Sequence, residues 1–134
     1  MPGQASTLGS KIALDAMTGR ATQTARTMYL ALLTAAPTDA TTLATMSELS
    51  ATGYARATCA MSDPTTTEAS TNTALLTFGP FSTDPASAGW CALVSAASGT
   101  AGDFVFWWTL DTPRDAASGD SITVAIGALS MGAE

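Results

Sequence analysis

The chain has no histidine, a single lysine (Lys11) and few charged residues, which make up 12% of its 134 positions. Histidine is the commonest general base and metal ligand near neutral pH, so its absence removes the most frequent route to acid–base catalysis. An enzyme built from this sequence would need carboxylates, a thiol or a hydroxyl activated in a less usual way. A structural or binding role is therefore the default expectation.

Cysteine and long apolar runs are also scarce. Cys59 and Cys91 are too few for a disulfide framework and lack a Cys-x-x-Cys spacing, so we expect two small buried thiols. The longest strongly apolar run, Phe104–Trp108, is far shorter than the roughly 20 residues of a membrane span, so no membrane partner is expected. The N-terminus lacks the basic start and apolar middle of a signal peptide, which predicts a protein made and kept in a cytoplasm.

Basic residues number only five against 11 acidic ones, giving a formal net charge of -6. Binding to a phosphate backbone depends on clustered Lys and Arg, and the basic residues here are scattered, so nucleic acid is not an expected partner. The length suits one domain. We expect an N-terminal arm or helix over residues 1–20, followed by a single β domain over residues 21–134.

The helix is predicted from Leu8, Ile12, Leu14 and Met17, which recur at roughly helical spacing before a stop at Gly19. After it, short apolar and β-branched runs alternate with turn-forming residues, the rhythm of an antiparallel β domain. We therefore expect an all-β fold, a compact sandwich or half-open barrel of about six or more strands. The expected strands are Thr27–Thr34, Gly53–Met61, Ala74–Phe78, Trp90–Ser95, Phe104–Leu110 and Ser121–Leu129.

Several strands carry more specific predictions. Thr27–Thr34 is apolar on both faces and should be central, with cover on each side. Trp90–Ser95 and Phe104–Leu110 flank a glycine-containing loop and should pair antiparallel. The segment 41–50 is expected to be a helical turn or a loop packed on the sheet, and Asp63–Ser70 a loop by composition.

Two strands are predicted from alternation. In Gly53–Met61, the small residues should face the core, with Tyr54, Arg56 and Thr58 on the other face. In Ser121–Leu129, one face carries Ile122, Val124 and Ile126. Its opposite face is made of small residues, and it could lie against another layer or another chain.

Candidate chemistry is sparse. Three carboxylates in Asp111–Asp120 could ligate a hard cation such as calcium, but Asp, Pro, Ser and Gly are also the usual residues of a turn between strands, and the turn is the favoured interpretation. A paired-carboxylate hydrolase is disfavoured because the acidic residues fall mainly in predicted loops and element ends. No catalytic residue, metal site or cofactor is predicted.

Candidate interface residues are easier to name. Trp107 and Trp108 are adjacent on a strand and must point to opposite faces, so one could be core and the other a partner anchor or a residue packed under a loop or the N-terminal arm. Arg56 beside Tyr54 could form a recognition pair, although stacking or a bond to Glu48 is the more common arrangement. The full candidate set is Leu8, Ile12, Leu14, Tyr54, Arg56, Trp107 and Trp108.

Five short segments also form one ordered pattern that covers about residues 8 to 131: Tyr29–Asp39, Glu48, Gly53–Arg56, Ser70–Ala74 with Phe78, and Ser118–Ile122. The pattern resembles a family of small tailed-bacteriophage virion proteins. Its members are often labelled tail fibre proteins, and part of the family is described as capsid-stabilising or head decoration proteins. The Trp107–Trp108 pair and the sequence Pro113–Asp115 depart from the family pattern, which leaves the attachment surface open.

The resemblance implies a non-enzymatic virion protein, made in the bacterial host cytoplasm. The leading hypothesis is a head decoration subunit that binds the outside of the assembled major capsid protein and neighbouring copies of itself, with a homo-oligomer such as a trimer plausible by symmetry. The alternative is a minor tail or tail-fibre-associated protein. A further alternative is a glycan-binding module in which Trp90, Trp107, Trp108 or Tyr54 supplies the stacking surface. The segment before Arg26 could act as an arm that docks on a neighbouring subunit.

Overall fold

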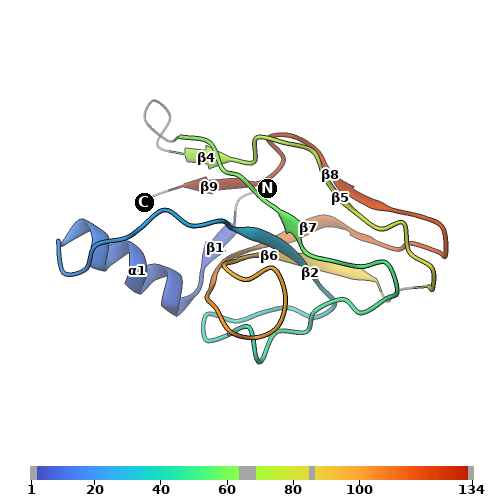
Figure 1. Ribbon diagram of the computed structural model, residues 1–134, viewed down its shortest axis with the longest axis horizontal. Helices are drawn as coiled ribbons and strands as arrows, with labels where there is room; N and C mark the ends of the chain where they lie inside the picture. The colour runs from blue at the N-terminus through green and yellow to red at the C-terminus, as the bar shows by residue number, and fades with distance from the viewer. Residues whose placement is uncertain (1–2, 64–68, 85–86, 133–134) are drawn as a thin grey trace.

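The fold is built around one five-stranded antiparallel sheet, seen in a computed structural model that describes residues 3–63, 69–84 and 87–132 (Figure 1). The sheet contains β1 (Gly3–Ala5), β2 (Tyr29–Leu33), β3 (Ala57–Thr58), β6 (Ala88–Val94) and β7 (Phe104–Arg114) in the order β1-β7-β6-β2-β3. Two smaller antiparallel pairs lie over one face: β4 (Ala69–Thr71) with β9 (Ser130–Gly132), and β5 (Leu76–Phe78) with β8 (Ile122–Val124). The prediction of an all-β fold with a short N-terminal helix is confirmed.

Both faces of the central sheet are covered, as the sequence of β2 predicts. Leu30 and Leu32 point into the larger core beneath the β5–β8 pair, where Phe78, Ile122 and Trp108 are also buried. The side chain of Leu33 joins a second cluster on the opposite face, which contains Leu43, Ala92, Val94 and Phe104. Alternate residues of one strand therefore supply two separate cores.

The segment 41–50 closes the second face as a loop packed on the sheet, one of the two predicted forms. Leu43 is buried in the second cluster, with Met46 packed against it, while Leu49 is buried in the larger core and Glu48 forms an isolated β-bridge with Leu33. The amides of Thr34 and Leu49 donate to Ser47 O and Leu32 O, which attaches the loop to the C-terminal end of β2.

A β-bulge at Val105 explains how β7 serves both cores. Leu93 pairs with Phe106 while the next residue, Val94, pairs with Phe104, so β7 has one extra residue at this point. The extra residue reverses the alternation, which sends the Phe104 ring to the second cluster and the Phe106 ring to the larger core. The predicted antiparallel pairing of the two strands is confirmed.

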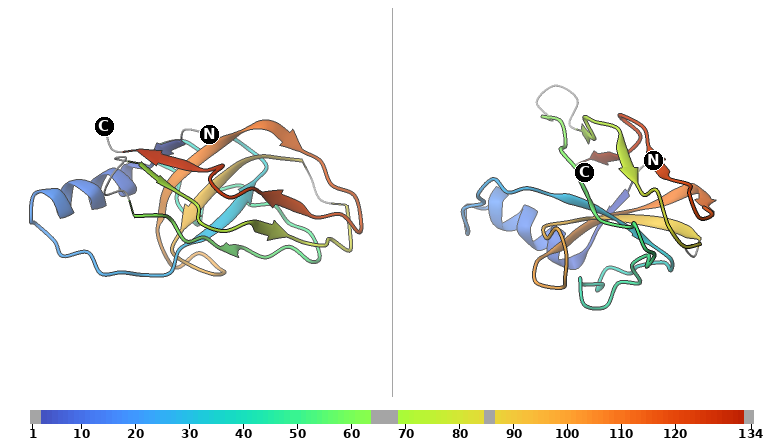
Figure 2. Two further views of the ribbon diagram at one scale, coloured as in Figure 1. Left: turned by 90° about the horizontal axis from the view of Figure 1, so that it is seen from above. Right: turned by 45° about the vertical axis from the view of Figure 1, so that its right-hand side comes forward.

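The predicted helix is confirmed as α1 (Thr7–Met17), which projects to one side of the sheet (Figures 1 and 2). Ser6 is its N-cap, and Gly19 follows its end with a φ of 71°. The sequence analysis missed β1, which precedes the helix and pairs antiparallel with residues 106–108 of β7.

Two predictions from alternation need correction. Ile126 does not share the buried face of Ile122 and Val124 but is 66% exposed, because β8 ends at Val124 and the chain turns through Gly127, whose φ is 77°. Ala55 is exposed rather than packed in the core, since β3 pairs only at Ala57 and Thr58. Cys59 on the same predicted face is buried as expected.

The loop predicted over Asp63–Ser70 is shorter than expected at its far end, because β4 begins at Ala69. Residues 64–68 of that prediction lie outside the described residues. A buried asparagine, Asn72, anchors the connection from β4 to β5: its amide donates to Ala74 O (3.1 Å) and Ala125 O (2.9 Å), and its carbonyl accepts from the Leu129 amide (2.9 Å). The Asn72 side chain thus holds the turn that follows β8, through Ala125 and Leu129, which lie 53 and 57 positions further along the chain.

Candidate functional site

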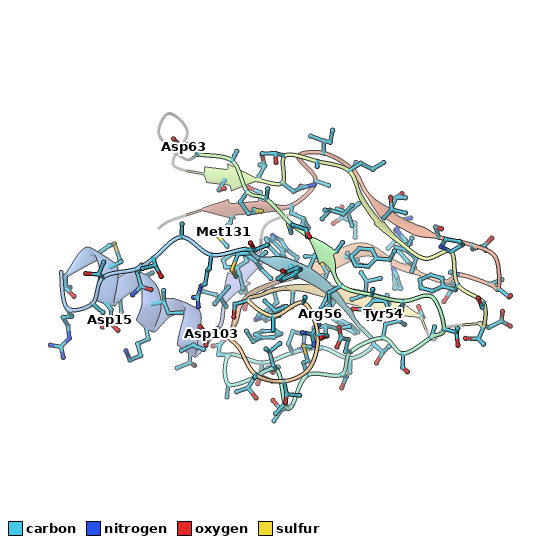
Figure 3. All side chains as sticks on the ribbon, in the orientation of Figure 1. Asp15, Tyr54, Arg56, Asp63, Asp103 and Met131 are labelled. Carbon is cyan, nitrogen blue, oxygen red and sulfur yellow. The ribbon has the colours of Figure 1, made fainter. Side chains whose placement is uncertain are left out.

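Tyr54 and Arg56 lie in an internal polar network rather than on a free surface (Figure 3). The Arg56 guanidinium donates from Nε and Nη2 to the two carboxylate oxygens of Glu48, each at 2.8 Å, which is the bidentate geometry of a strong ion pair. Its remaining bonds reach Ala96 O and Gly99 O, both at 2.9 Å. The Arg56 side chain is only 4% exposed.

Tyr54 completes this network from the other side. Its hydroxyl donates to Glu48 Oε2 at 2.7 Å and accepts from the Leu32 amide at 3.1 Å, while its ring stacks on Phe78 with centroids 6.1 Å apart. Burial, followed by the hydrogen bond to Glu48, raises the pKa of Tyr54 well above its ordinary value. The hydrogen bond to Glu48 likewise raises the pKa of Arg56. The structural interpretation of this pair, with Glu48 as partner, is the one observed.

The two adjacent tryptophans point to opposite faces, as predicted. Trp108 is fully buried in the larger core, where its ring lies 4.9 Å from that of Phe106 and its Nε1 donates to Ser130 O at 2.8 Å. Trp107 is half-buried against the second cluster, and its Nε1 is buried with no hydrogen-bond acceptor among the described residues. Trp90 packs against the same cluster. The tryptophans therefore mainly build the two cores.

The cysteines are also internal. Both are free thiols in the core, and burial raises the pKa of Cys59 to about 11 and that of Cys91 to about 12. A thiol with so high a pKa holds little thiolate near neutral pH and is a poor nucleophile. The prediction of two buried thiols is confirmed.

The acidic segment Asp111–Asp120 is part strand and part turn. β7 extends to Arg114, and the turn that follows is closed by carboxylates: Asp120 Oδ2 accepts from the Ala117 amide at 3.1 Å, and Asp84 Oδ1 accepts from the Ser118 amide at 2.7 Å. Within the described ranges, no group of three or more His, Cys, Asp or Glu side chains is placed to hold a metal ion. The turn interpretation accounts for these residues.

The start of α1 is fixed to the sheet by the β-bulge of β7. Ser6 donates from its amide to Val105 O (3.1 Å) and from its hydroxyl to Phe104 O (2.6 Å), while the same hydroxyl accepts from the Gly9 amide (2.9 Å) and caps the helix. A Cβ added to Gly9 would lie 1.9 Å from Val105 O, so only glycine permits this approach. The sequence signal that could have revealed this joint is a serine three residues before a glycine at the start of the helical pattern.

Beyond its first turn, α1 contacts the domain only loosely. None of its residues from Thr7 to Met17 is buried, and the predicted interface residues differ in exposure: Ile12 is half-buried, Leu8 is 37% exposed and Leu14 is 57% exposed. Met17, at the end of the helix, is 73% exposed. A solitary helix of this length is marginal in water unless an apolar face packs against something.

A groove opens at the opposite end of the molecule, between the second half of β7 and β8. Its volume is about 440 Å³, and its lining includes Leu32, Leu110, Ile122 and Val124, with Asp111 and Arg114 among the polar residues. We call this the β7–β8 groove. The candidate interface residues are therefore not one site. Tyr54, Arg56 and Trp108 are internal, whereas Leu14 lies on α1, which Figure 1 shows on the side of the molecule opposite to β8.

The fold is a small β-sandwich domain in which the buried polar side chains, such as Arg56 and Asn72, hydrogen-bond to the domain's own loops. The helix α1 projects from this domain. Among the described residues, no helix combines the length and apolar character needed to cross a membrane. By its fold, the chain belongs to the class of small, mostly β proteins with a single N-terminal helix among the described residues.

The family model for podophage GP4 fiber I protein gp80 matches residues 4–132, and the chain belongs to this fibre-type family. The resemblance to a family of phage virion proteins is thereby confirmed. A comparison with curated proteins found no match.

Proposed function

We propose that this chain is a non-enzymatic, fibre-type subunit of the phage tail, attached to the virion through its N-terminal helix. The observation that carries the proposal is the match of residues 4–132 to a family described as fiber I protein, which covers nearly the entire chain. The geometry supports it, because a rigid β body with one projecting, unburied helix suits a component whose task is attachment.

The polar chemistry of the domain supports a non-enzymatic role. Arg56, the most buried charged side chain among the described residues, is fully engaged by Glu48 and two backbone carbonyls, and both thiols are buried with raised pKa values. A catalytic centre needs a group whose protonation or nucleophilicity is available to a substrate. The described groups with shifted pKa values are instead committed to the fold.

Head decoration remains a second candidate, favoured by the ordered motifs from Tyr29 to Ile122 that resemble capsid-stabilising proteins. In that role the partner would be the major capsid protein, and many weak contacts would be multiplied over the shell. The glycan-binding alternative has less support, because Trp108 is fully buried and Trp90 and Trp107 are half-buried against the second cluster.

Copy number separates the two locations. Quantitative mass spectrometry of purified virions should give a few copies of this chain per particle, a number set by the symmetry of the tail. A count comparable to that of the major capsid protein would overturn the tail proposal and establish shell decoration. Absence from purified virions that contain all other structural proteins would reject both.

A further inference from the structure

Three sulfur-containing side chains meet at the edge of the larger core, where β2 begins. The ladder between β2 and β3 continues one residue past the pair Tyr29 and Thr58, because the Cys59 amide donates to Met28 O at 2.8 Å. Residues that lie opposite each other in an antiparallel pair project from the same face of the sheet. Met28 and Cys59 are therefore neighbours on the face that packs against the larger core.

Met61 brings a third sulfur atom to the same place. It lies two residues after Cys59, on the same face of an extended chain, and it packs against the same core. The Cys59 thiol donates to Met61 Sδ, with 3.8 Å between the two sulfur atoms. A β-bridge from Met61 to Asn72 fixes this segment beside the end of β4. Backbone pairing on both sides thus sets the positions of the three side chains.

These three side chains line one cavity, whose volume is about 530 Å³. Met28 and Met61 are half-buried, whereas Cys59 is only 2% exposed, so the thiol lies deeper than the two thioethers. The other lining residues are all exposed, which shows that the cavity reaches the surface; they are Arg26, Thr27, Thr58 and Ala60. A small ion therefore has a route from solvent to the sulfur atoms.

The donor set is that of a soft cation. Thiolate and thioether sulfur are soft ligands, and sites built from Cys and Met select copper(I) over harder ions. Metal–thiolate bonds are about 2.3 Å long, so two sulfur ligands of one three-coordinate ion lie about 4 Å apart. The separation of 3.8 Å between the sulfur atoms of Cys59 and Met61 is close to this value. The two side chains need little movement to bind one ion.

The charge at the cavity is compatible with a monovalent cation. Among the described residues that line the cavity, Arg26 is the only charged one, and its guanidinium donates to the Asp103 carboxylate at 2.6 Å. Binding of the cation to Cys59 releases the thiol proton to water, so one positive charge leaves as another arrives. The net charge of the site is unchanged.

We propose that Met28, Cys59 and Met61 form a binding site for one soft monovalent cation of the copper(I) type. The Cys59 thiolate and the two thioether sulfur atoms are its ligands. The bound ion connects the start of β2 to the segment that follows β3. This site goes beyond the proposed attachment role, which uses α1 and none of these three residues.

Packing alone is the competing explanation, because Met and Cys readily fill cores. Cys91 shows what packing alone provides: it is fully buried in the same core, but it does not line the cavity. Cys59 differs in having two thioether neighbours and an approach from the surface through the cavity. The two cysteines therefore form a matched pair for the experiment.

The test titrates the intact, reduced chain, without oxygen, against copper(I) held by the coloured chelator bicinchoninate. The wild type should withdraw one equivalent of copper, and calorimetry in buffers of different ionisation enthalpy should show the release of one proton. Cys59→Ala should abolish the transfer. Met28→Leu and Met61→Leu should each weaken binding about tenfold, because leucine keeps the volume of the side chain but lacks the donor.

Control variants remove sulfur atoms outside the cavity. Cys91→Ala removes the other buried thiol, and Met17→Leu removes a thioether on α1, so both should bind copper within about twofold of wild type. Copper(I) should also raise the thermal unfolding midpoint of the wild type but not that of Cys59→Ala, because a ligand that binds only the folded state stabilises it. Near-ultraviolet circular dichroism checks that each variant remains folded.

Three results would overturn the proposal. They are a wild type that withdraws no copper, methionine variants that bind as tightly as the wild type, and a loss in Cys91→Ala as large as that in Cys59→Ala. The methionine variants keep the test decisive if Cys59→Ala does not fold. None of these measurements uses the virion, so their outcome is independent of the copy-number test of tail location.

Discussion

Replacing Arg56 with methionine should destabilise the domain by about 3 kcal/mol. The methionine retains much of the apolar stem but removes the guanidinium, leaving the Glu48 carboxylate with Tyr54 as its remaining donor in this network. Breaking a buried ion pair by removing one partner costs about 3–5 kcal/mol. The lower end applies here, because the Glu48 side chain is 24% exposed and water can solvate part of the stranded charge.

The measurement is urea unfolding followed by circular dichroism, at neutral pH, for Arg56→Met, Glu48→Gln and the double variant. The double variant should lose less than the sum of the two single losses, with a coupling energy of about 2 kcal/mol, because removing the second partner also removes the stranded charge. A lysine at position 56 should rescue only part of the loss, since an ammonium cannot make the bidentate contact.

Arg26→Met provides the matched control. Arg26 also forms an ion pair, with Asp103 at 2.6 Å, but its side chain is 39% exposed and the pair lies at the surface. Its loss should cost less than about 1 kcal/mol. The reasoning would be refuted if Arg56→Met cost no more than this control, or if the Arg56 and Glu48 effects were additive.

Three further predictions concern other parts of the fold. Asn72→Ala should cost about 3 kcal/mol in urea unfolding because it strands three backbone groups, whereas Thr73→Ala at the exposed neighbour should cost less than about 1; equal losses would contradict this. Gly9→Ala should detach α1, seen as faster amide exchange over residues 7–17 with the sheet still protected, and Ser10→Ala should not; unchanged exchange in the glycine variant would be the contrary result. The free energy of unfolding should fall as pH rises above 9, the ordinary pKa of a thiol, because the unfolded state then releases a proton that the buried Cys91 thiol keeps up to a pKa of about 12. Cys91→Ala should reduce the slope of the free energy of unfolding against pH by up to about 1.4 kcal/mol per pH unit. An unchanged slope would disprove this assignment.

Local patterns predicted the elements that depend on local signals. The apolar spacing from Leu8 to Met17 and the stop at Gly19 indicated α1, because both the helical face and its terminator are encoded within a few residues. The two-sided apolar character of β2 likewise predicted a strand covered on both faces. Adjacent tryptophans in a strand must diverge, and they do.

Features that depend on distant partners were not predictable in the same way. The residues of β1 have no strand pattern of their own, and they join the sheet because the edge of β7 at residues 106–108 accepts them. The bulge at Val105 is invisible in the local alternation, yet it determines where Phe104 points and where Ser6 binds. Ile126 was misassigned because alternation continues in the sequence beyond the point where the chain turns.

The candidate site shows the same division. The Glu48–Arg56 pair was among the arrangements weighed from the sequence, because complementary charges lie eight positions apart in one connected region. The β7–β8 groove was not, since its walls come from strands whose relative placement is set by packing of the two layers.

The 11-residue strand β7 has a further consequence for any assembly of this chain. It begins at the carbonyls that hold Ser6 and ends beside the β7–β8 groove, so one continuous strand joins the root of the helix to the acidic segment Asp111–Asp120. A partner held at α1 and the β7–β8 groove are therefore kept at a separation that the central sheet sets and that solution conditions change little.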